Sequence, residues 1–237
     1  MASAKNIKWP EDSVQGFVGT WWEQDPHGRA TRGALAYAWV PHVEQVPKQF
    51  ILKGRSEAKD HSSFKVSVRP FSGSGAKAQA QMGLPIAAVP LHADEILLGL
   101  TAKEHPVLII SDGPRLPGPI GRSPRWAGKL LIAPYIELIG KKGASCAPRE
   151  FVTRTRRAHY ANLIWDMPPS EIGTVESILR LDCIQPIAQG SAALRMSGWR
   201  LSNLALEIIE DWFVWLRKGG LPKGSDLLEI RTALQEL

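Results

Sequence analysis

Two short apolar runs, Pro106-Val-Leu-Ile-Ile-Ser111 and Lys129-Leu-Leu-Ile-Ala-Pro134, decide the fold that this chain is expected to adopt. Each run is too short for a typical helix and is bounded by breaking or charged residues, so we expect two buried β-strands. Residues 112–128 include four prolines, four glycines and three arginines. We expect a long loop there, and loops of this length in compact domains are usually functional or mobile.

Further strand candidates lie on both sides of this pair. Phe64-Lys-Val-Ser-Val68 alternates between apolar and polar residues, which is typical of a half-buried strand. With two earlier runs it predicts an antiparallel meander within residues 33–71. The other candidates are Ala34–Val40, Gln49–Leu52, Leu84–Val89, Tyr160–Trp165 and Ser177–Ile184.

A tract of linker composition, Ser72-Gly-Ser-Gly-Ala-Lys-Ala-Gln-Ala-Gln81, marks the predicted domain boundary. Residues 1–80 are expected to form an N-terminal extension with the β-meander, and residues 81–237 a second domain. The first 33 residues lack a sustained period, so we expect an irregular arm that its tryptophans pin to the body of the protein: Trp9, Trp21 and Trp22.

The C-terminal region has a helical pattern. Ser202 is a candidate N-cap, and Gly219 follows two basic residues, as expected at a helix C-terminus. Ser225 is a candidate cap of a second short helix. The apolar residues at helical spacing are Leu204, Ile208, Ile209, Trp212 and Leu216. The expected fold class is therefore mainly β with C-terminal helices (α+β).

Composition excludes several classes of protein. The N-terminal stretch MASAKNIKWP lacks the apolar core of a signal peptide, and acidic residues interrupt the apolar stretch Leu204–Leu216, so we expect a cytoplasmic protein without a membrane span. Cys146 and Cys183 lack C-x-x-C spacing, which argues against a disulfide framework and a zinc site. The scattered histidines suggest no metal site, and no cofactor is expected.

The positive charge is concentrated in one part of the chain. Residues 103–160 hold eleven Lys and Arg against four Asp and Glu, whereas residues 201–237 hold four against six. A clustered positive field attracts polyanions such as nucleic acid. The alternative interpretation is a solvated surface that keeps the protein soluble.

The order of these segments resembles the MazF/PemK growth-inhibitor toxins over roughly residues 84–219. The resemblance depends on four segments taken together and in sequence: Lys103-Glu-His-Pro-Val-Leu-Ile-Ile-Ser111, Leu131-Ile-Ala-Pro134, Glu176-Ser-Ile-Leu-Arg-Leu-Asp-Cys-Ile-Gln-Pro-Ile187 and Leu201-Ser-Asn-Leu-Ala-Leu-Glu-Ile-Ile209. It implies a small SH3-like β-barrel with a C-terminal helix, in addition to the N-terminal β-rich extension. It also implies a homodimer, an antitoxin or other protein partner, and metal-independent cleavage of single-stranded RNA.

The chain departs from the catalytic pattern of that family. The family's arginine falls on His105, and its Thr or Ser falls on Tyr135-Ile136-Glu137. His105 could still act as base or acid near neutral pH, Glu137 or Tyr135 could be its partner, and Lys103 could hold the phosphate. The alternative interpretation of His105 is a turn residue before a proline.

Basic and aromatic residues in and beside the long loop are the predicted RNA contacts. Guanidinium and ammonium groups bind phosphates, and an aromatic ring can stack on a base. These residues are Arg115, Arg122, Arg125, Trp126, Lys129, Lys141 and Lys142. The alternative is a solvated loop whose tryptophan packs into the core. A second basic run, Arg154, Arg156 and Arg157 before His159-Tyr160, is interpreted as an ordinary exposed strand edge.

The sequence leaves three functions open. The first is a toxin-like endoribonuclease that needs no metal, or a diverged descendant of one. The second is a catalytically inactive barrel that binds RNA or a protein partner. The third, drawn from fold-mates of the same toxin family, is a poison of DNA gyrase that acts through C-terminal residues.

Overall fold

The computed structural model describes residues 8–60, 62–73, 91, 95–112, 128–138, 144–170, 173–188 and 193–237. The chain divides into two compact units: a larger unit, Met1–Trp39 with Glu104–Leu237, and a smaller unit, Val40–Lys103. This division differs from the predicted boundary at residue 80. The smaller unit is an insertion between two strands that are neighbours in the sheet of the larger unit, and residues 1–39 belong to that larger unit.

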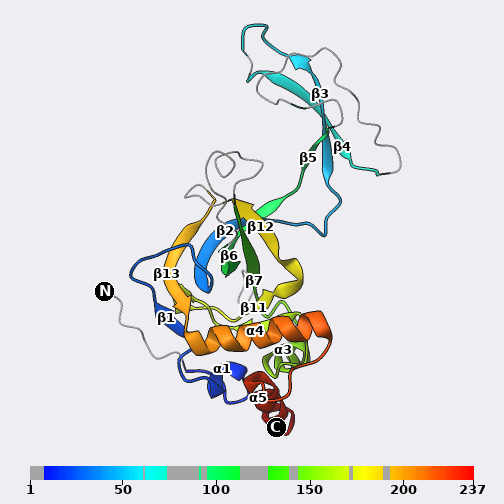
Figure 1. Cartoon of the computed structure of the whole chain (residues 1–237). Helices are drawn as coiled ribbons and strands as arrows, with labels where there is room; N and C mark the ends of the chain where they lie inside the picture. The colour runs from blue at the N-terminus through cyan, green and yellow to red at the C-terminus, as the bar shows by residue number, and fades with distance from the viewer. Residues whose placement is uncertain are drawn as a thin grey trace. The chain divides into compact units, whose positions relative to one another are not determined.

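The strands of the larger unit come from both sides of the insertion (Figure 1). They are β1 (Trp22–Gln24), β2 (Ala34–Pro41), β6 (Ala102–Ser111), β7 (Lys129–Glu137), β8 (Leu163–Asp166), β9 (Pro169–Ser170), β10 (Gly173–Thr174), β11 (Ser177–Arg180), β12 (Gln185–Ala188) and β13 (Arg195–Leu201). Its helices are α1 (Val14–Phe17), α3 (Arg149–Arg156), η1 (Leu181–Cys183), α4 (Asn203–Lys218) and α5 (Asp226–Gln235). The fold is mainly β with C-terminal helices, as predicted.

The main sheet is open rather than a closed barrel. Its strand order is β1-β13-β2-β6-β7-β11-β8, with β12 also paired to β7. Strand β7 has two partners besides β6. Its residues Lys129–Ile132 pair with β12, whereas Tyr135–Glu137 pair with β11. Among the described residues β1 and β8 stay at opposite ends of the order, so the predicted SH3-like closure is not observed there.

Strands β6 and β7 form at the two apolar runs that the sequence analysis identified. Val107, Leu108 and Ile109 are all buried although consecutive side chains on a strand point to opposite faces. Both faces of the sheet are therefore covered here, which explains why the run is continuously apolar instead of alternating. Leu108 lies opposite Ala133, and Ile109 opposite Ile132, in an antiparallel register.

Both C-terminal helices begin, and α4 also ends, where the sequence predicts. The Ser202 hydroxyl accepts a hydrogen bond from the backbone N–H of Ala205, and the Ser225 hydroxyl accepts one from Leu228, so both are N-caps. Helix α4 ends at Gly219, whose φ of 75° lies in the left-handed region that glycine adopts without strain.

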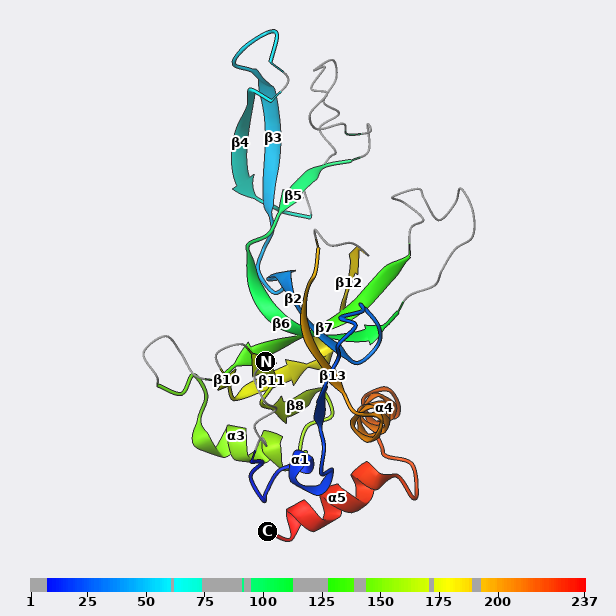
Figure 2. The ribbon, with the colours of Figure 1, turned by 90° about the vertical axis from the view of Figure 1, so that its left-hand side faces the viewer.

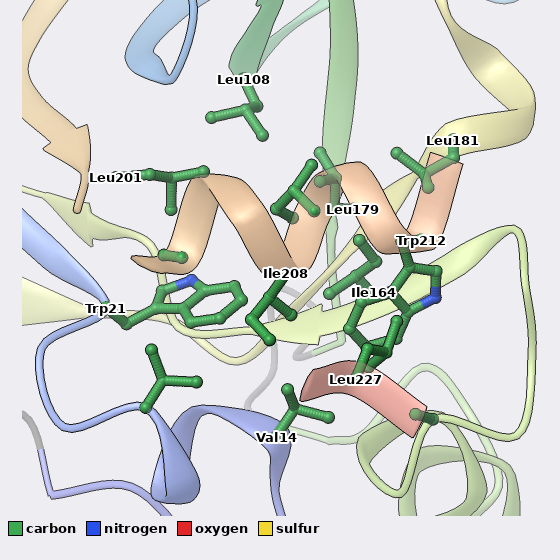
Figure 3. Close-up of a cluster of buried hydrophobic side chains, with 14 of the residues drawn as sticks. Val14, Trp21, Leu108, Ile164, Leu179, Leu181, Leu201, Ile208, Trp212 and Leu227 are labelled. Carbon is green, nitrogen blue, oxygen red and sulfur yellow. The ribbon is translucent and has the colours of Figure 1, made fainter. Parts of the chain in front are cut away.

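The main core lies between the sheet and the helices (Figures 2 and 3). Leu179 and Leu201 extend from the sheet toward α4, which contributes Ile208 and Trp212. Trp21 from the N-terminal arm is 1% exposed and belongs to the same cluster, which confirms that tryptophans pin this arm to the body. The other labelled members are Val14, Leu108, Ile164, Leu181 and Leu227.

The smaller unit is a three-stranded antiparallel sheet in the order β4-β3-β5, formed by β3 (Lys48–Arg55), β4 (Phe64–Pro70) and β5 (Leu97–Gly99). Its β3–β4 hairpin is the part of the predicted meander that is confirmed, whereas β2 joins the main sheet. Gly99 lets the Phe50 ring of β3 lie close to β5, because a Cβ at this position would lie 2.3 Å from Cε2 of Phe50 and the ring would have to move.

Some predictions fall outside the described residues, and others need correction. The predicted strand over 84–89 lies among the residues that the structure does not describe, as does nearly all of the predicted loop over 112–128. The interpretation of the second basic run as a strand edge is wrong: Arg154 and Arg156 lie on helix α3, with Arg157 at its C-terminal end. Strand β13, which was not predicted, contains a bulge between Met196 and Trp199 that hides its alternation.

Candidate functional site

The four predicted catalytic residues occupy two kinds of environment. His105 on β6 is 6% exposed and Tyr135 on β7 is 1% exposed, so both are buried. Lys103 and Glu137 are exposed, and Lys103 is the last residue of the smaller unit. The interpretation of His105 as a turn residue is wrong, because it lies inside a strand.

Strand register separates the two buried candidates. Val107 of β6 pairs with Pro134 of β7, so these two side chains share a face of the sheet. His105 is two residues from Val107 and lies on that face, whereas Tyr135 is adjacent to Pro134 and points to the opposite face. The structure therefore does not assemble His105 and Tyr135 into one site.

Most of the predicted RNA contacts fall outside the described residues: Arg115, Arg122, Arg125, Trp126, Lys141 and Lys142. Lys129 is described, and it is the first residue of β7, where it pairs with Ala188 of β12. The predicted RNA surface on the long loop therefore stays a prediction.

Sequence reasoning missed a buried carboxylate at the end of β8. Asp166 is 1% exposed, and its Oδ2 accepts hydrogen bonds from the Tyr135 hydroxyl at 2.8 Å and from Nε1 of Trp21 at 3.3 Å. Its Oδ1 accepts from Nε1 of Trp22 at 3.2 Å and from the backbone N–H of Met167 at 2.7 Å. This carboxylate connects the N-terminal arm, β7 and β8. The available signal was the Trp21-Trp22 pair, since buried indole N–H groups need acceptors.

Burial dominates the electrostatics of this carboxylate. Burial raises the pKa of Asp166 to about 6, although the hydrogen bonds from Tyr135, Met167, Trp22 and Trp21 act in the opposite direction. Burial also raises the pKa of Tyr135 well above its usual range, and the Asp166 charge and hydrogen bond add to this effect. Both groups are enclosed by the core, so their role is to hold the arm against the sheet.

A more accessible group of polar residues lies where α3 ends. Ala158 follows this helix with a φ of 53°, a left-handed conformation that turns the chain toward His159. The His159 backbone N–H donates to the carbonyl of Arg154 at 3.0 Å, and Nε of Arg231 on α5 donates to the carbonyl of Ala158 at 2.9 Å. The C-terminal turn of α3 is thus held by a residue of α5 that follows it by about 70 positions in the sequence.

The arginines at the end of α3 and on α5 influence the protonation of the imidazole of His159. Partial burial is the largest cause that lowers the pKa of His159 below its usual 6.5, and the positive charges of Arg154, Arg231 and Arg157 lower it further. The side chain is partly exposed. The neutral form of the imidazole is therefore favoured over the protonated form.

Aromatic rings support these arginines without neutralising them. The guanidinium of Arg154 lies 5.6 Å from the centroid of the Tyr160 ring, and that of Arg231 lies 4.6 Å from the centroid of Trp215. Such cation–π contacts restrict the side chain while its charge remains available. The Tyr160 ring is itself held by Phe151, with a centroid separation of 5.6 Å.

One carboxylate partly balances this charge. An Nη of Arg156 lies 2.7 Å from Oδ2 of Asp12, and Nε of Arg157 lies 3.6 Å from the same oxygen. Within the described part of the chain these are the ion pairs of Arg154, Arg156, Arg157 and Arg231, which we call the arginine cluster. Two of the four guanidiniums thus share one carboxylate, so the cluster keeps a net positive charge that suits an anionic ligand.

The sequence indicated only part of the arginine cluster. Its three arginines on and after α3 form the second basic run, but no sequence pattern connects Arg231 to them, because the packing of α5 brings it there. Among the residues that the structure describes, no group of three or more His, Cys, Asp or Glu side chains could hold a metal ion. No helix within the described ranges is sufficiently long and apolar to cross a membrane.

The chain matches no protein-family model, and it matches neither a curated protein nor a solved structure.

Proposed function

We propose that the protein binds single-stranded RNA and that the RNA phosphates lie against the arginine cluster. The observation that carries this proposal is that Arg231 of α5 reaches the C-terminal end of α3, where Arg154 and Arg157 lie: its Nε donates to the carbonyl of Ala158 at 2.9 Å. A planar guanidinium can donate two parallel hydrogen bonds to one phosphate, so such a group of arginines is well suited to a phosphodiester backbone.

Exposed rings favour a single strand of RNA over a duplex. Tyr160 and His159 are partly exposed rings beside the arginines, and such rings can stack on unpaired bases. A duplex hides the faces of its bases and would use the charges alone. The formal net charge of +6 also speeds the encounter with any nucleic acid, but it does not select RNA.

The resemblance of residues 84–219 to MazF/PemK toxins supports the same ligand class. RNA is the ligand that this resemblance implies. The family's catalytic pair is absent from this chain, which has His105 and the Tyr135-Ile136-Glu137 segment at those positions. Membership of that family, a diverged SH3-like barrel, a homodimer and an antitoxin partner stay predictions of the resemblance.

The test is the salt dependence of RNA binding. A fluorescent single-stranded RNA whose 2′-hydroxyls are methylated cannot be cleaved by its own 2′-oxygen, so its anisotropy reports binding alone. Arg154→Gln is expected to lower the slope of log affinity against log salt by about 0.7, because one phosphate contact to a single strand is lost. The same loss weakens binding roughly fivefold at 0.1 M salt.

Arg29→Gln is the matched control, because it removes the same charge from an exposed position between β1 and β2 that does not act on His159. Its slope should equal that of the wild type. Equal slopes for all three proteins would refute the proposed site. Equal affinity for a duplex DNA of the same length would refute the preference for single-stranded RNA.

A further inference from the structure

One face of the main sheet carries an exposed tryptophan that does not belong to the core. Leu35 of β2 packs in the main core, and Tyr37 and Trp39 lie on the same face, because side chains alternate along a strand. Trp39 is 66% exposed, and it lies roughly 13 Å along the strand from Leu35. The core that α4 covers therefore ends before Trp39, and the indole ring is open to solvent.

Two charged side chains lie beside these rings. Arg195 of β13 pairs with Tyr37 in the sheet, and its guanidinium lies 4.0 Å from the centroid of the Tyr37 ring. An Nη of Arg195 lies 3.5 Å from Oε1 of Glu104 on β6, so the arginine crosses β2 to reach the strand on its other side. The side chain of Arg195 is 55% exposed and that of Glu104 is 43% exposed, so a ligand can reach both.

We call this group of residues the strand site: Tyr37, Trp39, Glu104 and Arg195. All of its members belong to the larger unit. In Figures 1 and 2, helix α5, which carries Arg231, lies on the other side of α4 from β2. The strand site is therefore separate from the arginine cluster.

The chemistry of the strand site matches an unpaired guanine base. An exposed tryptophan ring offers a stacking surface to any base. The carboxylate of Glu104 can accept parallel hydrogen bonds from N1–H and N2–H of guanine, while the guanidinium of Arg195 donates to the neighbouring O6. Adenine, cytosine and uracil do not present two adjacent donors to one carboxylate. A cationic ligand is disfavoured, because Arg195 already lies over the Tyr37 ring.

We infer that the strand site binds an unpaired guanine of the single-stranded RNA, with the base stacked on Trp39 and its Watson–Crick edge against Glu104 and Arg195. This inference rests on the proposed function. Phosphate contacts at the arginine cluster position the RNA but carry no sequence information, whereas a contact to a base edge selects the sequence. The strand site therefore gives the protein a preference among RNAs.

The experiment compares three single-stranded RNAs that differ at one central position, which is guanine, inosine or adenine among uridines. Each labelled strand is titrated with the full chain, and fluorescence anisotropy gives its affinity. The guanine strand should bind roughly 5- to 150-fold more tightly than the adenine strand, the discrimination expected of a bidentate contact to a base edge. Inosine lacks the N2 amino group, so its strand should have an intermediate affinity.

One substitution tests the stacking surface. Trp39→Ala should weaken the binding of every strand by roughly 5- to 150-fold, because stacking tolerates any base. Trp39→Phe keeps a ring and should keep most of the affinity. The matched control is Phe17→Ala, which removes a 48% exposed ring from α1 and should leave the affinities unchanged.

A second substitution tests the recognition of the base edge. Glu104→Gln should abolish the preference for guanine, since an amide offers one acceptor oxygen where the carboxylate offers two. The matched control is Glu23→Gln, because the Glu23 side chain is also 43% exposed and its Oε1 lies 2.9 Å from Nε of Arg200. This control should keep the preference.

The outcomes distinguish this inference from the proposed function. If the three strands bind equally, the guanine inference is overturned and RNA binding stands. Unchanged affinity of the Trp39→Ala protein, or a guanine preference that survives Glu104→Gln, also overturns it. Competition by free guanosine monophosphate as effective as that of the guanine strand would show a nucleotide site in place of an RNA site. If Arg154→Gln leaves the salt dependence of RNA binding unchanged, the proposed function fails, whatever the base preference.

Discussion

The larger and smaller units differ in how much of their apolar surface they bury. The larger unit covers both faces of β6 and β7, and its core takes in the N-terminal arm, α4 and α5. In the smaller unit six of the seven residues of β4 are exposed, including Val66 and Val68. A sheet packed on two faces has a large cooperative core, whereas a three-stranded sheet has little apolar surface to bury. The comparison locates the stability of the chain, and the arginine cluster, in the larger unit.

The largest expected effect comes from removing a core aromatic of the larger unit. Trp212 on α4 is 1% exposed, packs beside Trp215 and donates from Nε1 to the carbonyl of Tyr160 at 3.3 Å. Trp212→Ala should lower the free energy of unfolding by about 3–5 kcal/mol, because it removes buried apolar area and leaves a cavity. Urea denaturation followed by far-ultraviolet circular dichroism measures this loss.

Leu52→Ala is the corresponding substitution in the smaller unit, since Leu52 is 3% exposed. It should increase hydrogen exchange in β3 and β4 while the amides of β6 and β7 keep their protection. If it weakened both units equally, the two units would form one cooperative structure and the comparison would be wrong.

A second, smaller effect follows from the buried carboxylate of the larger unit. The pKa of Asp166 is about 6 in the folded chain, against a usual value of 3.8. Between pH 3.8 and about 6, the carboxyl of Asp166 is therefore mostly protonated in the folded state and mostly ionised in the unfolded state. The free energy of unfolding consequently rises as the pH falls from 7 to about 4.5. The full difference corresponds to on the order of 3 kcal/mol. Urea denaturation at a series of pH values measures it.

Asp166→Asn cannot titrate and should lose this rise in stability, whatever its absolute stability at pH 7. Hydrogen-exchange protection of the amides in β7 and β8 should show the gain in stability of the wild type. The amides of β3 and β4 should not show it, because the carboxylate lies in the larger unit. A wild-type stability that falls steadily from pH 7 to 4.5 would show that Asp166 is not a buried acid with a raised pKa.

The smallest effect is expected on the open face of the smaller unit. Val68 on β4 is 50% exposed, so Val68→Thr keeps the branched shape and changes little buried area. The free energy of unfolding should change by less than about 0.5 kcal/mol. Hydrogen exchange of β3 and β4 provides the measurement, and a loss above 1 kcal/mol would show that this side chain is covered in solution.

Local patterns account for the parts of the fold that could be predicted. The runs at 106–111 and 129–134 become β6 and β7, and the caps Ser202 and Ser225 begin α4 and α5, because each of these signals lies within a few neighbouring residues. Strand β13 escaped prediction because Gly198, with a φ of 79°, lies in a bulge that interrupts the alternation. The predicted boundary at residue 80 differs from the division of the structure, because the tract of linker composition lies within Val40–Lys103, and composition alone does not distinguish an insertion from a link between domains.

Local sequence patterns also predicted only part of the candidate site. The sequence suggested His105 for catalysis because the catalytic arginine of the toxin family falls on this position, but the imidazole is buried, with 6% of the residue exposed. The second basic run was visible as a set of charges, and its helical form was not. Asp166 was missed because a single acidic residue after a short apolar run has no distinctive pattern.

The sequence by itself determined the short buried strands, the two capped C-terminal helices and the clustering of positive charge, because each depends on residues close together in the chain. Only the tertiary structure decided that the sheet stays open, that Trp21, Trp22 and Tyr135 meet on Asp166, and that Arg231 reaches the end of α3. These arrangements join segments that are tens of residues or more apart. Their pairing depends on which surfaces bury the most apolar area together, and no local pattern records that choice.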